Sequence, residues 1–377
     1  MMKAEGTNAL ITIPINSGAH TAIGELNGQM IEDMQNQQAT LKIQTGTVTY
    51  TIPTSEINID AVSAQLGQHI ALVDIKVQIR IAEPSATTVT VVQSAATTSE
   101  FSLVVSAIEY SISCTYNDQT VEVSTFNAYV ERTVAITEGV DSAKITTGIV
   151  VKPDGTTYHV PTKITIIEGK YYAVINSLTN STYTVIWHPI EFEDVAGHWA
   201  KDAINDMGAR MIVSGSDGLN YEPDRDITRA EFTTIVIRAL GLDAGIGENK
   251  FSDVDSNDWY CDYIETAISY GIIKGYGDGT FGPNDKITRE QAMVIITRSM
   301  AITGLDATLT DVEISELLSA YTDSSEAESY AKSSIAACLN TGIVTGRSGN
   351  MVAPKANITR AEVAIIVRRL LQKSNLI

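Results

Sequence analysis

Three arginines recur at equivalent positions in the second half of the chain, and their surroundings suit them to bind an anion. Arg229, Arg289 and Arg360 each follow an Ile-Thr pair, and each lies 30 positions after an aromatic residue. A planar guanidinium beside the start of a helix can hold a carboxylate or a phosphate. The helix dipole mildly disfavours a cation at that position, so the arginine gains nothing from the helix itself. The pattern therefore predicts a negatively charged partner for each arginine.

Two kinds of partner fit this pattern equally well, a ligand and an acid of the protein itself. Buried arginines commonly form structural ion pairs as well as binding sites. The internal acids that could serve are Asp224, Asp226, Asp285 and the acidic residues at the start of another copy. Both alternatives stay open on the sequence alone.

An aromatic residue, a glycine and a proline accompany each arginine at fixed distances. The glycine is 16 positions after the aromatic, and the proline is 6 positions before the arginine. The three sets are Trp199, Gly215 and Pro223; Trp259, Gly275 and Pro283; and Tyr330, Gly346 and Pro354. We interpret the aromatics as core residues, with stacking on a sugar as the alternative. The glycines are typical of tight turns between helices, with close approach of a ligand to the backbone as the alternative.

Each copy of this repeat predicts two helices joined by the glycine-containing loop, and self-similarity at a long period indicates one unit built three times. The first helices are expected at residues 199–211, 259–272 and 330–341, and the second at 227–240, 287–300 and 358–371. A threonine followed three positions later by Glu or Gln opens each second helix as a capping box. The capping pairs are Thr228 and Glu231, Thr288 and Gln291, and Thr359 and Glu362. These residues therefore have a complete structural explanation.

The sequence pattern of the first half of the chain predicts strands and turns. Apolar residues alternate between residues 40 and 187, as in Val77, Ile79 and Ile81, which is typical of half-buried strands. Thr45-Gly46 predicts a hairpin, and Leu26, Met30 and Met34 predict one short helix. We expect a β-sandwich-like region over 1–189, as one domain or as two divided near residues 83–99. Its histidines are scattered and its acids stand singly, so no catalytic or metal site is predicted.

The net charge of −19 excludes partners that bind by diffuse attraction to a basic surface, namely nucleic acid and anionic membranes. No run of about 18 apolar residues exists that could span a bilayer. The first residues lack the apolar core of a signal peptide, so we expect that the signal was removed or that the chain is a fragment. Three cysteines without metal-ligand spacing are expected to be small buried residues.

The repeated motifs resemble S-layer homology (SLH) repeats of Bacillota. The resemblance rests on Phe-x-Asp-Val at 192–195 and 251–254, on His198-Trp199 and Asp258-Trp259, on Gly-Tyr-Gly-Asp-Gly-Thr-Phe-Gly-Pro at 275–283, and on the three Ile-Thr-Arg openings. It implies repeats at 190–249, 250–305 and 306–377. The implied fold is a multidomain α+β protein, in which a β-rich region precedes an all-α pseudo-threefold SLH trimer with grooves between neighbouring repeats.

The resemblance also implies a ligand, a secondary cell-wall polysaccharide that often carries a pyruvyl ketal on an amino sugar. Its carboxylate would be the anion that the arginines lack. The residues carried over as polymer-binding are Arg229, Arg289, Arg360, Trp199, Trp259, Asp194, Asp253, Gly215 and Gly275. No cofactor is implied. The third copy departs from the pattern, with Tyr330 in place of tryptophan and about 11 extra residues, which predicts a weaker or purely structural groove.

We therefore expect a non-catalytic anchor at the outer cell surface, with the β-rich region as a spacer. Replacing Arg229 and Arg289 with alanine is expected to abolish wall binding without unfolding the protein. The alternative is the C-terminal part of a secreted, wall-anchored enzyme that degrades polysaccharide. Self-association into a surface layer through the β-rich half is a third hypothesis.

Overall fold

A computed structural model describes residues 7–16, 20–67 and 69–377, and the chain divides into two compact units. The first unit is Met1–His188 and the second is Pro189–Ile377. The first is built mainly from antiparallel sheet and the second from helices, so the expected mixed α+β class is confirmed. No helix in the described part of the chain is long and apolar enough to cross a membrane.

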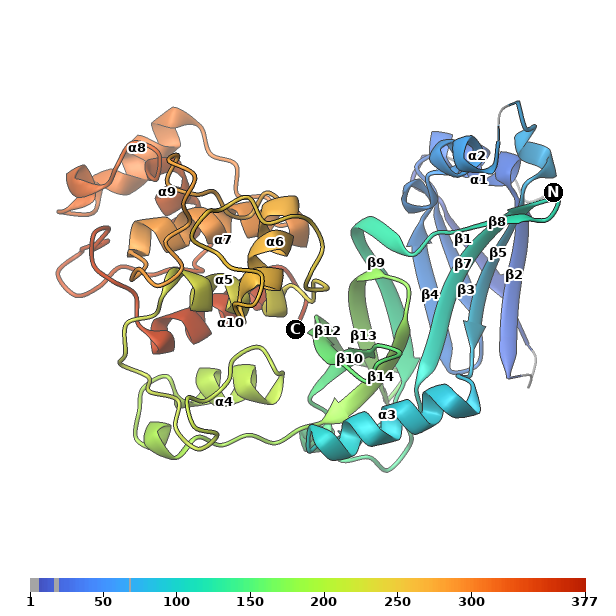
Figure 1. Cartoon of the computed structure of the whole chain (residues 1–377), viewed down its shortest axis with the longest axis horizontal. Helices are drawn as coiled ribbons and strands as arrows, with labels where there is room; N and C mark the ends of the chain where they lie inside the picture. Colours follow the sequence, from blue (N-terminus) through green and yellow to red (C-terminus); the bar gives the residue numbers. More distant parts are fainter. Residues whose placement is uncertain (1–6, 17–19, 68) are drawn as a thin grey trace. The chain divides into compact units, whose positions relative to one another are not determined.

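Two sheets form the first unit (Figure 1). The six-stranded sheet has the order β1 (Leu10–Pro14), β3 (Thr40–Gln44), β4 (Val48–Pro53), β9 (Thr125–Ala135), β13 (Lys170–Thr179) and β12 (Thr162–Ile167). The eight-stranded sheet has the order β11 (Thr157–Val160), β10 (Thr147–Val151), β14 (Thr182–Trp187), β7 (Ile108–Tyr116), β5 (Lys76–Ala82) and β2 (Thr21–Asn27), with β6 (Ser102–Leu103) on β14 and β8 (Gln119–Glu122) on β7. All the pairs are antiparallel except β1 with β3. The Thr45-Gly46 hairpin is confirmed as the β3–β4 connection.

The two sheets pack face to face around one core. Alternate residues such as Ile43 of β3 and Ile79 of β5 are fully buried in the same cluster. A side chain on Gly24 of β2 would lie 2.7 Å from Ile43, which shows how closely the sheets approach. The strands on either side of residues 83–99 pair with each other as β5 and β7, so the alternative of two separate sandwiches is wrong.

Three helices cover the ends of this sandwich: α1 (Gly28–Asn36), α2 (Ile59–Leu66) and α3 (Ala86–Thr98). Figure 1 shows α1 and α2 at one end of the strands and α3 at the other. The short helix expected near Met30 and Met34 is confirmed as α1, but its buried face is made by Ile31 and Met34, while Met30 is exposed and Leu26 lies in strand β2. The sequence did not predict α2 or α3. Short 3₁₀ turns lie at Thr54–Ile57, Leu72–Asp74 and Ser142–Lys144.

The second unit contains the two helices expected in each copy, and the three capping boxes are confirmed. The first helices are α4 (Lys201–Ala209), α6 (Cys261–Ser269) and α9 (Lys332–Asn340), and the second are α5 (Arg229–Ala239), α7 (Arg289–Thr303) and α10 (Arg360–Lys373). An extra helix, α8 (Asp311–Ser319), occupies the insertion before the third copy, and 3₁₀ turns lie at Glu193–Val195 and Ser324–Glu326. All three cysteines of the chain are buried and free, as expected.

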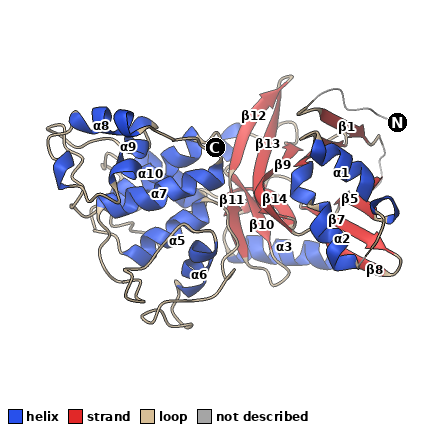
Figure 2. Cartoon of the chain, turned by 90° about the horizontal axis from the view of Figure 1, so that it is seen from above, coloured by secondary structure: helices blue, strands red, loops and turns tan. Residues whose placement is uncertain are grey.

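Contacts between the copies run in a closed order. Helices α5, α7 and α10 touch one another, and each first helix packs on the second helix of the preceding copy, α6 on α5, α9 on α7 and α4 on α10. Figure 2 shows α5, α7 and α10 grouped within the helical unit. The backbone of the isoleucine before each cap repeats this order. Ile287 donates to Ile227, Ile358 to Ile287 and Ile227 to Ile358, with N–O distances of 3.3, 3.2 and 3.1 Å.

Candidate ligand-binding grooves

The aspartate near the start of each copy holds the glycine loop of the same copy in place. Asp253 accepts hydrogen bonds from the backbone N–H groups of Phe281 and Gly282, both at 2.8 Å. Asp194 accepts from Tyr221 and Glu222 in the same way. Both carboxylates, which sequence reasoning placed in the polymer site, are thus engaged by their own loops.

The glycine of each loop is required by close packing. A side chain on Gly275 would lie 2.4 Å from both the ring of Phe251 and the carbonyl oxygen of Thr280, and one on Gly215 would lie 2.8 Å from the carbonyl oxygen of Asn220. Because the aromatic that precedes the aspartate fills this space, the turn interpretation of Gly215 and Gly275 has direct geometric support.

The first turn of each second helix has no free backbone donor for an anion. Arg229 N donates to Asp285 O at 2.9 Å and Ala230 N to Pro283 O at 3.0 Å, both in the next copy. Glu231 N is taken by the capping hydroxyl of Thr228. The other two helices repeat this pattern, with the third copy donating to the loop of the first. The expectation that an anion would bind at these helix starts is therefore wrong for the backbone amides.

The three arginine side chains cross from one copy to the next and are almost entirely buried. Arg229, Arg289 and Arg360 expose only 5, 3 and 6% of their surface. Each Nε donates to a backbone carbonyl of the following glycine loop, namely Phe281 O at 2.9 Å, Val352 O at 3.0 Å and Tyr221 O at 2.7 Å. Burial lowers the pKa of Arg229 and Arg289. The arginines therefore bind the copies together.

Two of the arginines already have a carboxylate partner. Arg289 Nη1 lies 3.0 Å from Glu362, and Arg360 Nη1 lies 3.5 Å from Glu231. These acids are the capping-box glutamates of the following copy, not the aspartates that sequence reasoning named. Burial raises the pKa of Glu231, but hydrogen bonds from Arg225 and Thr228 outweigh this effect, and the net shift is downward. The ion-pair alternative is thus realised for Arg289 and Arg360.

The aromatic residues ahead of the first helices face solvent. Trp199, Trp259 and Tyr330 expose 68, 58 and 56% of their surface, so their assignment to the core is wrong. Each stands in the turn before its helix rather than on the apolar face of the helix, and α4 begins only at Lys201. Large exposed aromatics at three equivalent positions are the feature that a sugar-binding surface requires.

One groove brings these features together. A cavity of about 260 Å³ is lined by Trp199 of the first copy, Arg289 of the second, and residues of the third copy that include Gly346, Arg347, Glu362 and Arg369. Glu362 is shared, because Arg347 Nη2 lies 2.8 Å from the same carboxyl oxygen that pairs with Arg289. The described lining thus holds three arginines and one glutamate, so its formal charge is positive. Sequence reasoning missed Arg347 and Arg369.

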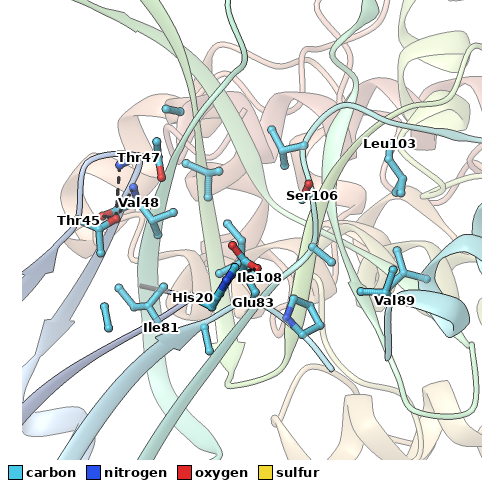
Figure 3. Close-up of a pocket in the computed structure, with 18 of the residues that line it drawn as sticks. His20, Thr45, Thr47, Val48, Ile81, Glu83, Val89, Leu103, Ser106 and Ile108 are labelled. Atoms are coloured by element: carbon cyan, nitrogen blue, oxygen red, sulfur yellow. Dashed lines mark hydrogen bonds and ion pairs between the residues drawn. The ribbon is translucent and has the colours of Figure 1, made fainter. Parts of the chain in front are cut away.

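A larger cavity of about 740 Å³ lies in the first unit (Figure 3). Its walls are mostly apolar, with side chains such as Val48, Ile81 and Ile108, and a pair formed by His20 Nδ1 and Glu83 at 2.5 Å lies within it. Glu83 is the only carboxylic acid among the described lining residues.

Comparison with known proteins agrees with the helical repeats. The S-layer homology domain matches residues 191–233, 250–293 and 320–364. Among curated proteins, an amylopullulanase of Thermoanaerobacterium thermosulfurigenes is 37% identical over 53% of this chain and 10% of its own length. Exoglucanase XynX of Acetivibrio thermocellus is 36% identical over 52% of the chain and 18% of its own. The surface-layer 125 kDa protein of Lysinibacillus sphaericus is 29% identical over 48% and 15%.

The match thus covers less than a fifth of each of these three relatives. S-layer homology domains attach proteins to the cell wall, and they indicate an extracellular location at the cell surface. With three matched copies and S-layer proteins among its relatives, this chain is a cell-surface protein whose second unit carries three S-layer homology domains.

Proposed function

We propose that the second unit is a non-catalytic anchor that binds a pyruvylated secondary cell-wall polysaccharide in grooves between its repeats, and that the β-rich unit is a spacer. The proposed repeats are 190–249, 250–305 and 306–377. The observation that carries the proposal is the groove that joins exposed Trp199 to a cluster of arginines. In an otherwise acidic chain, a groove lined by three arginines and one glutamate is suited to bind an anion.

We further propose that the three repeats form a pseudo-threefold trimer within one chain. The closed order of the isoleucine hydrogen bonds supports this arrangement, as does the packing of each first helix on the preceding copy. Under this symmetry the groove of Trp199 and Arg289 has two counterparts. One pairs Trp259 with Arg360, and the other pairs Tyr330 with Arg229.

The chemistry of a pyruvylated sugar fits such a groove. A sugar ring can lie on an exposed indole through its apolar C–H face, while guanidinium groups hydrogen-bond the ketal carboxylate. Among the residues carried over from the family, Trp199, Trp259 and the three arginines line these sites in the proposal. The other four residues do not contact the ligand in the proposal but fix the loops on which the grooves depend. They are Asp194, Asp253, Gly215 and Gly275.

Binding to purified cell walls tests this proposal. The full chain should sediment with walls at moderate salt, because a local ion pair is only partly screened. Chemical removal of the pyruvyl groups should abolish this sedimentation, because it removes the carboxylate. Equal sedimentation with treated and untreated walls would rule out recognition of the pyruvyl carboxylate.

Replacing Trp199 or Trp259 with alanine should weaken wall binding about tenfold each, since loss of an aromatic contact costs up to about 1.5 kcal/mol. Stability should stay unchanged because both indoles are exposed. Dissociation constants for wall fragments and thermal unfolding measure the two effects. Val312→Ala, which trims an equally exposed apolar side chain on α8, should bind like the wild type. A Trp199→Ala variant with full affinity would exclude stacking at that groove.

A second candidate function is supported by the relatives. Two of them are named an amylopullulanase and an exoglucanase, so the chain can be the C-terminal part of a secreted polysaccharide-degrading enzyme. Turnover of starch, xylan or wall polysaccharide by the chain itself would replace the pure-anchor proposal. The surface-layer relatives support self-association instead, and concentration-dependent sheet formation is the measurement that tests it.

A further inference from the structure

The three arginine sites differ in the charge of the capping-box residue that lies opposite the arginine. This residue determines whether Nη1 of the arginine has a carboxylate partner. Nη1 of Arg289 is paired with Glu362 and Nη1 of Arg360 with Glu231. The residue at the equivalent capping-box position in the second copy is Gln291. This copy supplies the loop that Arg229 contacts. An amide cannot neutralise a guanidinium, so Arg229 lacks the partner that its counterparts have.

The contacts of Arg229 leave one nitrogen available. Nε donates to Phe281 O at 2.9 Å and Nη2 to Lys274 O at 3.5 Å, while the rings of Tyr276 and Phe281 lie 4.6 Å from the guanidinium carbon. Nη1 forms no hydrogen bond or ion pair with the described residues. It is also absent from the set of buried polar atoms that lack a partner, so it reaches solvent. A side chain that is 95% buried thus presents a free N–H edge.

The acids near Arg229 are engaged elsewhere. Asp285 and Asp253 both act on its charge from beyond ion-pair distance. Asp285 accepts from the hydroxyl of Tyr276 at 2.9 Å, and Asp253 is held by two backbone N–H groups. Under the proposed threefold arrangement, the exposed aromatic of this site is Tyr330 of the third copy. In this arrangement an aromatic platform and a guanidinium without an ion-pair partner among the described residues belong to one site.

We propose that Gln291 makes the site of Arg229 and Tyr330 the primary carboxylate-binding site of this chain, while Glu231 and Glu362 act as built-in competitors at the other two arginines. This inference rests on the proposed function. A ligand carboxylate at Arg289 or Arg360 must displace a protein carboxylate, whereas at Arg229 it meets an open donor. In the groove of Trp199, Arg347 shares Glu362 with Arg289, and its side chain is about one third exposed, so an anion that it binds is held less tightly.

Calorimetric titration of the full chain with a pyruvyl-ketal N-acetylhexosamine glycoside tests this assignment, with the unmodified glycoside as the reference ligand. Gln291→Glu should lower the affinity of the tightest site at least tenfold. Glu231→Gln, the reverse change at the equivalent position, should strengthen binding at Arg360. The Gln291→Glu variant should fold normally, because glutamate fills the same capping box in the other two copies. Gln372→Glu adds the same charge on an exposed face of α10 and should bind like the wild type.

The outcomes separate this inference from the anchor proposal. If the wild type binds neither glycoside, pyruvyl recognition itself is refuted and this assignment with it. If the wild type binds the pyruvylated glycoside and Gln291→Glu binds it equally well, the assignment to Arg229 is refuted while the anchor proposal stands.

Discussion

Arg289→Ala should lower the free energy of unfolding of the helical unit by about 3 kcal/mol, the low end of the cost of breaking a buried ion pair. The side chain joins the second copy to the third through Val352 O, Thr345 O and Glu362. Its loss leaves two loop carbonyls without a donor, and it leaves Arg347 as the remaining ion-pair partner of Glu362. Hydrogen–deuterium exchange of α7 and α10 peptides in the full chain measures the effect, because it reports on each unit separately.

The control for this prediction is Lys332→Ala, which removes one positive charge from an exposed position on α9 and should leave exchange unchanged. The expectation that arginine-to-alanine variants lose wall binding while staying folded is therefore revised. Loss of wall binding by Arg289→Ala alone would not identify a ligand contact. Unchanged protection in α7 and α10 would show that the buried contacts contribute nothing and would restore a purely ligand-binding role.

The helical unit was readable from the sequence because its determinants are local. Capping boxes need residues three positions apart, and the spacing of proline, threonine and arginine repeats in every copy. The helix starts were therefore placed within two residues, at Arg229, Arg289 and Arg360. Burial was harder to predict. Tryptophan is usually core, and only the structure places Trp199 in a turn that faces solvent.

The site was less predictable because its contacts cross between copies. Glu231 and Glu362 looked fully used by helix capping, yet a carboxylate has two oxygens and enough lone pairs to cap a helix and pair with an arginine as well. The Glu-to-Gln difference at residue 291 was visible in the sequence. Its effect on charge follows only from the structure, in which the side chain of Arg229 contacts the second copy. In the β-rich unit, α3 was missed because its small and β-branched residues resemble those of a strand.

The β-rich unit also contains a buried arginine between its sheets, which the alternation of apolar residues could not predict. Arg132 of β9 is fully buried, and its guanidinium lies within about 5 Å of the rings of Tyr50, Tyr110 and Tyr183. Its Nη atoms donate to Val130 O at 2.8 Å and Thr179 O at 2.6 Å. Tyr110 and Tyr183 belong to the sheet opposite β9, so this one side chain links the two sheets through cation–π contacts.

Arg132→Ala should lower the free energy of unfolding of the β-rich unit by about 4 kcal/mol, since it empties a large buried site and strips donors from buried carbonyls. Exchange protection of β4, β9 and β14 peptides should fall while that of the helical unit stays unchanged. Arg80→Ala is the matched control, because Arg80 lies in the same unit but forms only a half-exposed pair with Glu109 at 3.6 Å, and its loss should cost less than 1 kcal/mol. If both variants lose the same protection, the contacts of Arg132 with the three tyrosines do not hold the sheets together, and the sandwich depends on its aliphatic core alone.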